Sequence, residues 1–292
     1  MAPPDGLPEL AWKPLGKGYD HFLEFFLQYC SKFLVEQSNP DLGAGLAAFS
    51  SSRAQSIFQT LKPRPRCLIQ GITCPSNGFN LYRYLTNAGV IEPAIHAIDI
   101  MDVGAIARAT GFVLEQVNFS VGDASKLSGW PDHSVQVLVQ DHLLNCCPHS
   151  GHESILAEAA RILDPRGIFI LNFSVDPQTD ESATLSWQES EARLEASLDG
   201  GAYCLKDVVG NGQRLCDAKR LVLGKLITGG FRQIVVTRPY GNFEFYSSAA
   251  SLENLLARLG MQFAFVSSER VATRGISCTR YHTLVRRIGD AL

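Results

Sequence analysis

Two acidic residues and a turn of small residues follow three successive apolar segments, and their types suit a polar ligand. The turn Gly-Ile-Thr-Cys-Pro-Ser-Asn-Gly begins at Gly71, and such a turn before a helix lets a ligand approach the backbone closely. Asp99 ends the next segment, Ala-Ile-His-Ala-Ile-Asp, where a carboxylate suits both hydroxyls of a ribose. Asp123 follows the third segment, where a carboxylate suits the exocyclic amine of an adenine.

A further polar group follows the apolar segment 135–139 and contains the residues best suited to proton transfer. These candidate catalytic residues are Asp141, His142 and Asn145. A histidine imidazole ordinarily titrates near neutral pH, so a histidine at position 142 suits the deprotonation of a phenol or hydroxyl. The alternative for His142 is a structural hydrogen bond between a helix and the sheet.

Other histidine and cysteine residues nearby favour packing over metal binding or nucleophilic catalysis. His149 and His152 flank Ser150 at an expected helix start, which is usually an exposed position, so we expect no metal site. Cys146 and Cys147 have no obvious activating partner. The 8 cysteines show no paired C-x-x-C spacing, and we expect them to be reduced.

Short apolar segments alternate with helical patterns between residues 66 and 175, which is typical of βαβ units and a parallel sheet. The expected strands are 66–71, 94–99, 115–121, 135–139 and 168–173, and the expected helices are 79–88, 103–110 and 150–163. Ser150 followed by Glu153 predicts a capping box at the start of the last helix. In such a sheet the carboxyl ends of the strands meet at one edge, so the polar groups above converge on one ligand site.

The flanking segments have helical or less regular patterns. An aromatic stripe at helical spacing in 19–36 predicts an amphipathic helix, which either packs on the domain or on a second subunit of a homodimer, or forms a lid over a ligand. Further helices are expected at 51–61, 186–198, 214–227 and 251–259, with an apolar run at 231–236 and strands at 262–266 and 281–285.

These patterns divide the chain into four parts. We expect an N-terminal helical lid over 1–62 and a ligand-binding core over 63–175. An inserted substrate cap over 176–245 and a segment 246–292 that completes the core sheet follow.

The composition excludes several classes of protein. With 46% hydrophobic residues in 292 positions, the chain can build a sizeable core and is neither disordered nor fibrous. Its net charge of −3 gives no general attraction to nucleic acid or anionic lipid, so we expect a small-molecule partner. The longest apolar-rich stretch, 22–35, is too polar to span a membrane and no signal peptide is visible, which predicts a cytoplasmic protein.

Three stretches carry a resemblance to a known family. Residues 130–140 (WPDHSVQVLVQ) resemble the PDxSFDVV strand of the class I S-adenosylmethionine-dependent methyltransferases. Residues 141–148 (DHLLNCCP) resemble the family's xxxLHHxxD segment, and residues 159–167 (AARILDPRG) are similar to its ARVLKPGG helix end. The resemblance implies a Rossmann-like α/β fold. That fold has a seven-stranded, mostly parallel sheet with helices on both faces, an N-terminal helical lid and an inserted cap.

The resemblance also implies that the chain binds S-adenosylmethionine and releases S-adenosylhomocysteine. Gly71 and Thr73 then lie beside the methionine part of the cofactor. Asp99 holds its ribose, and Ile100 or Met101 contacts the adenine face.

Further positions carry over from the family in the same way. Asp123 and Ala124 are expected at the adenine edge, and Gln140 beside the sulfonium. Tyr19, on a helix ahead of the core, is expected to reach the cofactor carboxylate. Asn145 occupies the position of the first histidine of the LHH segment and is expected to orient a substrate.

The turn after the first strand departs from the family pattern. The family usually has D/E-x-G-x-G-x-G there, whereas this chain keeps only Gly71 of the clustered glycines, so Thr73 and Asn77 are the expected cofactor contacts. The implied activity is metal-free methyl transfer to an oxygen or nitrogen of a small molecule in specialised metabolism, with base assistance from His142. Two alternatives stay open: a protein of this fold that catalyses a non-methylating reaction such as a cyclisation, and a non-catalytic partner subunit.

Overall fold

The computed structural model of the chain describes sixteen stretches of residues. They are 10–11, 45–72, 76–100, 103–104, 107, 115–147, 149–175, 184–185, 190–199, 202–207, 212–214, 234–238, 243–244, 246, 248–273 and 276–289. The amphipathic helix expected at 19–36 lies outside these residues.

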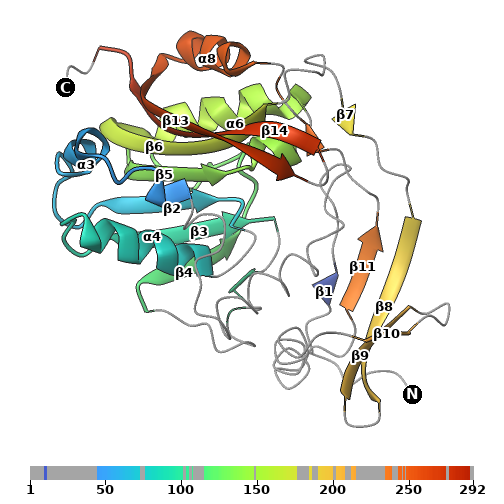
Figure 1. Cartoon of the computed structure of the whole chain (residues 1–292). Coiled ribbons are helices and arrows are strands. Elements are labelled where there is room, and N and C mark those ends of the chain that lie inside the picture. The colour runs from blue at the N-terminus through green and yellow to red at the C-terminus, as the bar shows by residue number, and fades with distance from the viewer. Residues whose placement is uncertain are drawn as a thin grey trace.

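The core of the protein is a seven-stranded sheet with the strand order β13-β14-β6-β5-β2-β3-β4 (Figure 1). The strands are β2 (Arg66–Gln70), β3 (Ala94–Asp99), β4 (Val117–Val121), β5 (Val135–Asp141), β6 (Leu163–Val175), β13 (Met261–Thr273) and β14 (Ile276–Arg287). The five strands from β4 to β6 are parallel, whereas β14 runs antiparallel to both β6 and β13. This arrangement confirms the predicted Rossmann-like, mostly parallel sheet.

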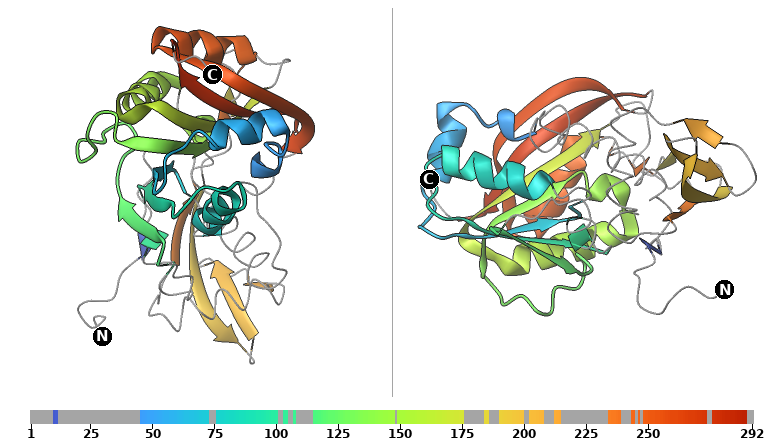
Figure 2. Two further views of the ribbon diagram at one scale, coloured as in Figure 1. Left: turned by 90° about the vertical axis from the view of Figure 1, so that its left-hand side faces the viewer. Right: turned by 90° about the horizontal axis from the view of Figure 1, so that it is seen from below.

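Helices cover both faces of this sheet, as the left view of Figure 2 shows. The helices α3 (Ser52–Phe58) and α4 (Ser76–Asn87) pack on one face, and α6 (His149–Ile162) and α8 (Ala249–Arg258) pack on the other. Successive strand residues alternate between these two cores: Ile69 belongs to the α3/α4 core and Leu68 to the α6/α8 core. Both side chains are fully buried, which explains why the central strands are apolar without interruption.

The chain order reverses between β2 and its neighbours, because β3 follows β2 in sequence on one side while β5 lies on the other. In an open α/β sheet this reversal leaves a crevice beyond the carboxyl ends of the strands. The carboxyl ends of β2, β3, β4 and β5 therefore border one site.

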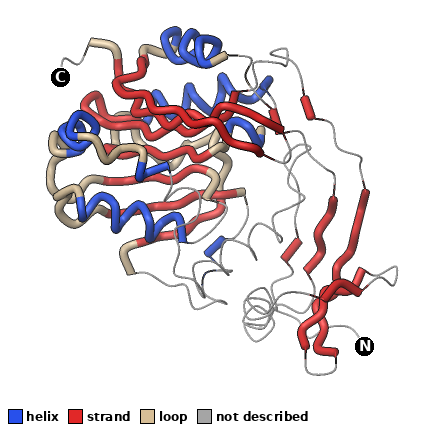
Figure 3. Tube along the Cα trace, in the orientation of Figure 1, coloured by secondary structure: helices blue, strands red, loops and turns tan. Residues whose placement is uncertain are grey.

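A second sheet has the order β1-β11-β8-β9-β10 and corrects one prediction (Figure 3). Its strands are β1 (Leu10–Ala11), β8 (Ser190–Asp199), β9 (Ala202–Asp207), β10 (Gly212–Arg214) and β11 (Ile234–Arg238), and β7 (Thr184–Leu185) pairs separately with β12 (Phe243–Glu244). The helix expected at 186–198 is wrong, because β8 occupies most of that segment and pairs with β9 and β11. Of the helix expected at 214–227, Arg214 ends β10 and the rest lies outside the described residues.

Two other expectations need smaller corrections. The predicted capping box is wrong, since α6 begins at His149 and Ser150 lies inside its first turn. The C-terminal strands are longer than expected, because β13 and β14 form a hairpin paired from Met261 to Arg287. In the part of the chain that the structure describes, no helix combines the length and apolar character needed to cross a membrane.

Candidate active site

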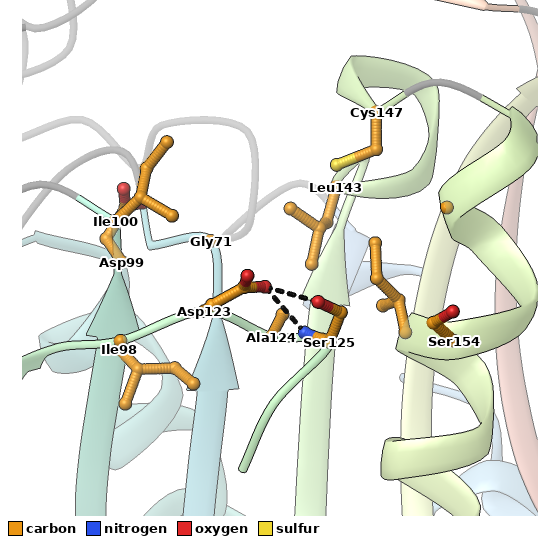
Figure 4. A pocket seen from close by; sticks show the side chains of 13 residues that line it. Gly71, Ile98, Asp99, Ile100, Asp123, Ala124, Ser125, Leu143, Cys147 and Ser154 are labelled. Carbon is orange, nitrogen blue, oxygen red and sulfur yellow. Dashed lines mark hydrogen bonds between the residues drawn. The ribbon is translucent and has the colours of Figure 1, made fainter. Parts of the chain in front are cut away.

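A cavity of about 290 Å³ opens at the carboxyl ends of β2, β3 and β4, beside the first turns of α6 (Figure 4). Thirteen residues line it: Gly71, Ile98, Asp99, Ile100, Gly122, Asp123, Ala124, Ser125, Leu143, Cys147, Gly151, Ser154 and Ile155. The cavity lies where the strand order reverses, so the fold and the sequence motifs indicate the same site. Five of the predicted cofactor contacts are among its lining residues: Gly71, Asp99, Ile100, Asp123 and Ala124.

The two carboxylates of the cavity come from neighbouring parallel strands. Asp99 is the last residue of β3 and is only 4% exposed. Asp123 follows β4, and its Oδ1 accepts hydrogen bonds from the backbone N–H of Ser125 at 2.8 Å and from the Ser125 hydroxyl at 2.7 Å. These two bonds fix the orientation of the Asp123 carboxylate within a tight turn.

Gly71 connects β2 to the cavity in a conformation that requires glycine. Its φ of 70° lies in the left-handed region. A Cβ atom at this position would lie 2.7 Å from Cδ1 of Leu143, which also lines the cavity. The close approach of the Gly71 backbone to Leu143 thus sets the width of the cavity at this point.

One wall of the cavity, formed by α6 and the turn before it, was not predicted from the sequence. Cys147, Gly151, Ser154 and Ile155 line the cavity from this side. The available signal was the pair of small residues Gly151 and Ser154, which are three apart and therefore share one helix face. Small side chains on that face leave room for a ligand.

Asp141 is the last residue of β5 and His142 follows it, and neither is among the lining residues of the cavity. Nδ1 of His142 is 3.2 Å from Oδ1 of Asp141, and their side chains are 15% and 10% exposed. The same Asp141 oxygen accepts a hydrogen bond from Nδ2 of Asn172 at 2.8 Å. Nε2 of His142 is buried and has no hydrogen-bond partner among the described residues. The backbone of His142 has a φ of 58°, which is uncommon for a non-glycine residue and is found at functional sites.

Asp141 is held in its charged form by its neighbours. Burial alone would raise the pKa of this carboxyl group, but hydrogen bonds from His142 and Asn172 and the positive charge of Arg280 outweigh it and keep the pKa below its ordinary value. A carboxylate in this state favours a proton on Nδ1 of His142, which leaves Nε2 as the basic nitrogen.

Asn145 has a different environment from the other two catalytic candidates. Its Nδ2 donates to the Ser174 carbonyl at 3.1 Å, and its Oδ1 accepts from the Ser174 backbone N–H at 2.9 Å. These bonds tie the short 3₁₀ helix η2 (Leu144–Cys146) to β6. The amide of Asn145 thereby positions the turn that carries Leu143 and Cys147 into the cavity.

Gln140 and Asn77 are buried and are not among the lining residues of the cavity. Nε2 of Gln140 donates to Oε1 of Gln70, which lies next to it on β2. Nδ2 of Asn77 donates to the Ile72 carbonyl at 3.4 Å. The predicted contacts Tyr19, Thr73 and Met101 lie outside the described residues.

The histidines at the start of α6 are less exposed than expected. His152 is 2% exposed, and its ring contacts those of His149 and Tyr246. No group of three or more potential metal ligands occurs within the described residues. These rings therefore pack the start of α6 against Tyr246, which forms a β-bridge with Val175 of β6.

Residues 77–171 match the family model described as "Methyltransferase domain". No curated protein sequence matches the chain. Similar solved structures include an S-adenosylmethionine-dependent methyltransferase from Methanosarcina mazei, with 16% identity over 80% of this chain and 98% of that chain and a TM-score of 0.48. Another is 1,6-didemethyltoxoflavin-N1-methyltransferase from Burkholderia thailandensis, with 14% identity over 95% of this chain and 93% of that chain and a TM-score of 0.45. A third is magnesium protoporphyrin IX methyltransferase from Synechocystis PCC 6803, with 16% identity over 91% of this chain and 97% of that chain and a TM-score of 0.46.

Proposed function

We propose that the chain, whose residues 77–171 match a methyltransferase domain, is a class I S-adenosylmethionine-dependent methyltransferase that methylates an oxygen or nitrogen of a small molecule. The observation that carries this proposal is the cavity at the carboxyl edge of the sheet, where Asp99 and Asp123 face one space beside Gly71. Two carboxylates separated by apolar walls suit a nucleoside, which has hydroxyl donors at one end and an amine donor at the other.

The residues of the cavity have distinct roles in this proposal. Asp99 accepts hydrogen bonds from the ribose hydroxyls, and Asp123 accepts from the adenine amine. Ile100 and Leu143 contact the faces of the nucleoside through apolar atoms. S-adenosylmethionine, when bound, supplies the methyl group as a sulfonium substituent.

The acceptor is expected on the side of β5 where His142 lies. With S-adenosylmethionine bound, Nε2 of His142 would take the proton of the acceptor oxygen or nitrogen, and S-adenosylhomocysteine would be the released product. The Asp141 carboxylate stabilises the resulting imidazolium through Nδ1. Holding the acceptor and the methyl carbon in line supplies much of the rate enhancement. Positioning, together with base assistance from His142, is therefore sufficient for methyl transfer.

The charge of the chain supports a small acceptor over a nucleic acid. Its net charge of −3 offers no general attraction to phosphates.

The proposal is tested with the full chain in two steps. Calorimetry with S-adenosylhomocysteine measures cofactor binding, for which we expect a micromolar dissociation constant. A panel of phenols, aliphatic alcohols and nitrogen heterocycles is then incubated with S-adenosylmethionine, and release of S-adenosylhomocysteine is measured. Absence of binding would favour a partner subunit, and binding without methyl consumption by any acceptor would favour a non-methylating reaction.

A further inference from the structure

The pair formed by Asp141 and His142 continues into the interior of the protein. Asn172, on the neighbouring strand β6, donates from Nδ2 to Asp141. Its Oδ1 lies 3.2 Å from Nδ1 of His282, on β14. Nε2 of His282 in turn lies 3.3 Å from a carboxylate oxygen of Glu269, on β13. We call this series of side chains the polar relay: His142, Asp141, Asn172, His282 and Glu269.

The chemistry of the groups fixes the direction of the hydrogen bonds in the relay. An ionised carboxylate only accepts, so the amide group of Asn172 that faces Asp141 is its NH₂. The amide oxygen of Asn172 then faces His282, so the proton of the neutral His282 imidazole lies on Nδ1, which donates it. Nε2 of His282 donates to Glu269 only when the ring is protonated on both nitrogens. Asn172 transmits this orientation, since turning its amide around would place two acceptors against each other at Asp141.

The centre of the relay is enclosed, whereas its end on β13 is open. Asn172 is fully buried and His282 is 3% exposed, whereas the side chain of Glu269 is 50% exposed. A residue from the N-terminal part of the chain, Gly45, packs directly over it: a Cβ at Gly45 would lie 2.6 Å from Nδ2 of Asn172. Burying these polar groups is unfavourable unless they hydrogen-bond, so their geometry is tightly determined.

We propose that Asn172 and His282 are positioning residues that hold Asp141 against Nδ1 of His142 and so keep the proton of the neutral His142 imidazole on Nδ1. This inference rests on the proposed function, in which Nε2 takes the acceptor proton. Asn172 keeps one oxygen of Asp141 in line with the imidazole, and His282 keeps the Asn172 amide in the orientation that donates. Asn172 and His282, which lie outside the cavity, thus orient the catalytic pair Asp141 and His142.

The charged groups around the relay support this arrangement. Burial raises the pKa of the Asp141 carboxyl group, but His142, Asn172 and Arg280 lower it further than burial raises it. For His282, burial lowers the pKa, while Glu269 and Asp141 act in the opposite direction and His142 adds to the lowering. Arg280 also lies 3.8 Å from Glu269, so the positive charge on β14 is shared between the two carboxylates.

Nuclear magnetic resonance of the full chain labelled with ¹⁵N in its histidine rings tests the inference. Long-range ¹H–¹⁵N correlations distinguish a protonated from an unprotonated ring nitrogen, and the His142→Gln spectrum identifies the His142 signals among the 7 histidines. In the unaltered protein at pH 8 we expect a single His142 tautomer with the proton on Nδ1. A proton on Nε2 would overturn the inference without any variant.

Three variants then separate positioning from packing. Asn172→Leu and His282→Leu keep the approximate volume but remove the hydrogen bonds, and we expect a shift of His142 to a mixture of tautomers. His282→Asn is the matched control, because its Nδ2 occupies the place of the imidazole Nδ1 and still donates, so the single tautomer should be kept. An unchanged His142 spectrum in a folded Asn172→Leu or His282→Leu protein would contradict the inference.

Calorimetry with S-adenosylhomocysteine on the same samples separates the two proposals. Loss of His142 tautomer control with unchanged S-adenosylhomocysteine affinity is the result we expect for both leucine variants. If the unaltered protein binds no S-adenosylhomocysteine, the proposed function fails whatever the tautomer. If it binds the ligand and the tautomer is indifferent to Asn172 and His282, only the relay fails.

Discussion

The Tyr246 hydroxyl donates a hydrogen bond to Nδ1 of His152, and Nε2 on the far side of the same ring donates to the Cys147 carbonyl at 2.9 Å. The carbonyl accepts only, so the proton of the neutral imidazole lies on Nε2 and Nδ1 must be the acceptor. His152 thereby joins α6 to Tyr246 and to Cys147, which lines the cavity. Burial in this position, together with the nearby His149, lowers the pKa of His152 to about 4.

We expect this histidine to destabilise the fold in acid. In the unfolded chain His152 binds a proton near pH 6.5, whereas the folded protein resists protonation until about pH 4. The stabilisation is therefore complete above pH 6.5 and is lost as the pH falls toward 4, up to about 3 kcal/mol. Urea unfolding at pH 7.5, 6, 5 and 4 measures the effect. His152→Gln should flatten this dependence, and an equal slope in both proteins would contradict the prediction.

Gly71→Ala should impair both folding and ligand binding. Gly89 is the matched control, because it also has a positive φ but has no atom within 4 Å of an added Cβ. Gly89→Ala should cost about 1 kcal/mol from backbone strain alone. Gly71→Ala adds a clash with Leu143 and should cost about 1–3 kcal/mol more in the free energy of unfolding. Leu143→Ala in the same chain should relieve the clash, and equal losses at Gly71 and Gly89 would show that the close approach does not matter.

Asp99→Ala should weaken the binding of S-adenosylhomocysteine. Losing hydrogen bonds to a charged group costs about 1.5–3 kcal/mol, which corresponds to a roughly 10- to 150-fold higher dissociation constant by calorimetry. Glu92→Ala removes an exposed carboxylate that pairs with Arg64 at 2.7 Å, so it serves as the control and should leave the affinity unchanged. An unaltered affinity in the Asp99 variant would remove this residue from the site.

His142→Ala should lower kcat by about 10²- to 10⁴-fold with an acceptor identified by the panel, while the Michaelis constant changes little. The affinity for S-adenosylhomocysteine should stay the same. His133→Ala is a suitable control, because His133 has a φ of 57° and so shares the backbone strain of His142. Unchanged turnover in the His142 variant would leave it a structural residue.

Asn145→Ala should reduce stability, because both partners on the Ser174 backbone are buried. The expected loss is about 1–3 kcal/mol, measured as a lower urea midpoint. Asn118→Ala, at an exposed position of β4, should change the free energy of unfolding by less than about 0.5 kcal/mol. Equal stability of the two variants would show that the Asn145 bonds contribute nothing net.

The strands of the core sheet and the segments after them were predictable from the sequence, because their apolar runs are bounded by turn residues. β3 (Ala94–Asp99) has the predicted bounds, and Asp99 and Asp123 lie at the cavity because every parallel strand ends at the same edge. The second sheet was not predictable in this way. In β8 the residues Ala192, Leu194, Ala196 and Leu198 alternate as in a strand, but the Glu, Ala and Leu content favours a helix.

The polar relay had a weaker sequence signal. Asn172 interrupts the apolar run Ile-Phe-Ile-Leu-Asn-Phe, and His282 precedes Thr-Leu-Val in the last strand. A polar residue within an apolar strand indicates a buried hydrogen bond, but the partner depends on sheet order and register. Only the pairing of His282 opposite Asn172 in the antiparallel β14–β6 ladder brings the two together.

The contact between Asn172 and His282 also sets an order of events during synthesis, because 110 positions separate them along the chain. The ribosome completes β6 well before the codons for β14 are read. Until the last hairpin emerges from the exit tunnel, β6 is an unpaired sheet edge and the amide of Asn172 faces water. The nascent chain can therefore form its cavity early, but Asn172 and His282 support Asp141 and His142 only after β14 has been translated.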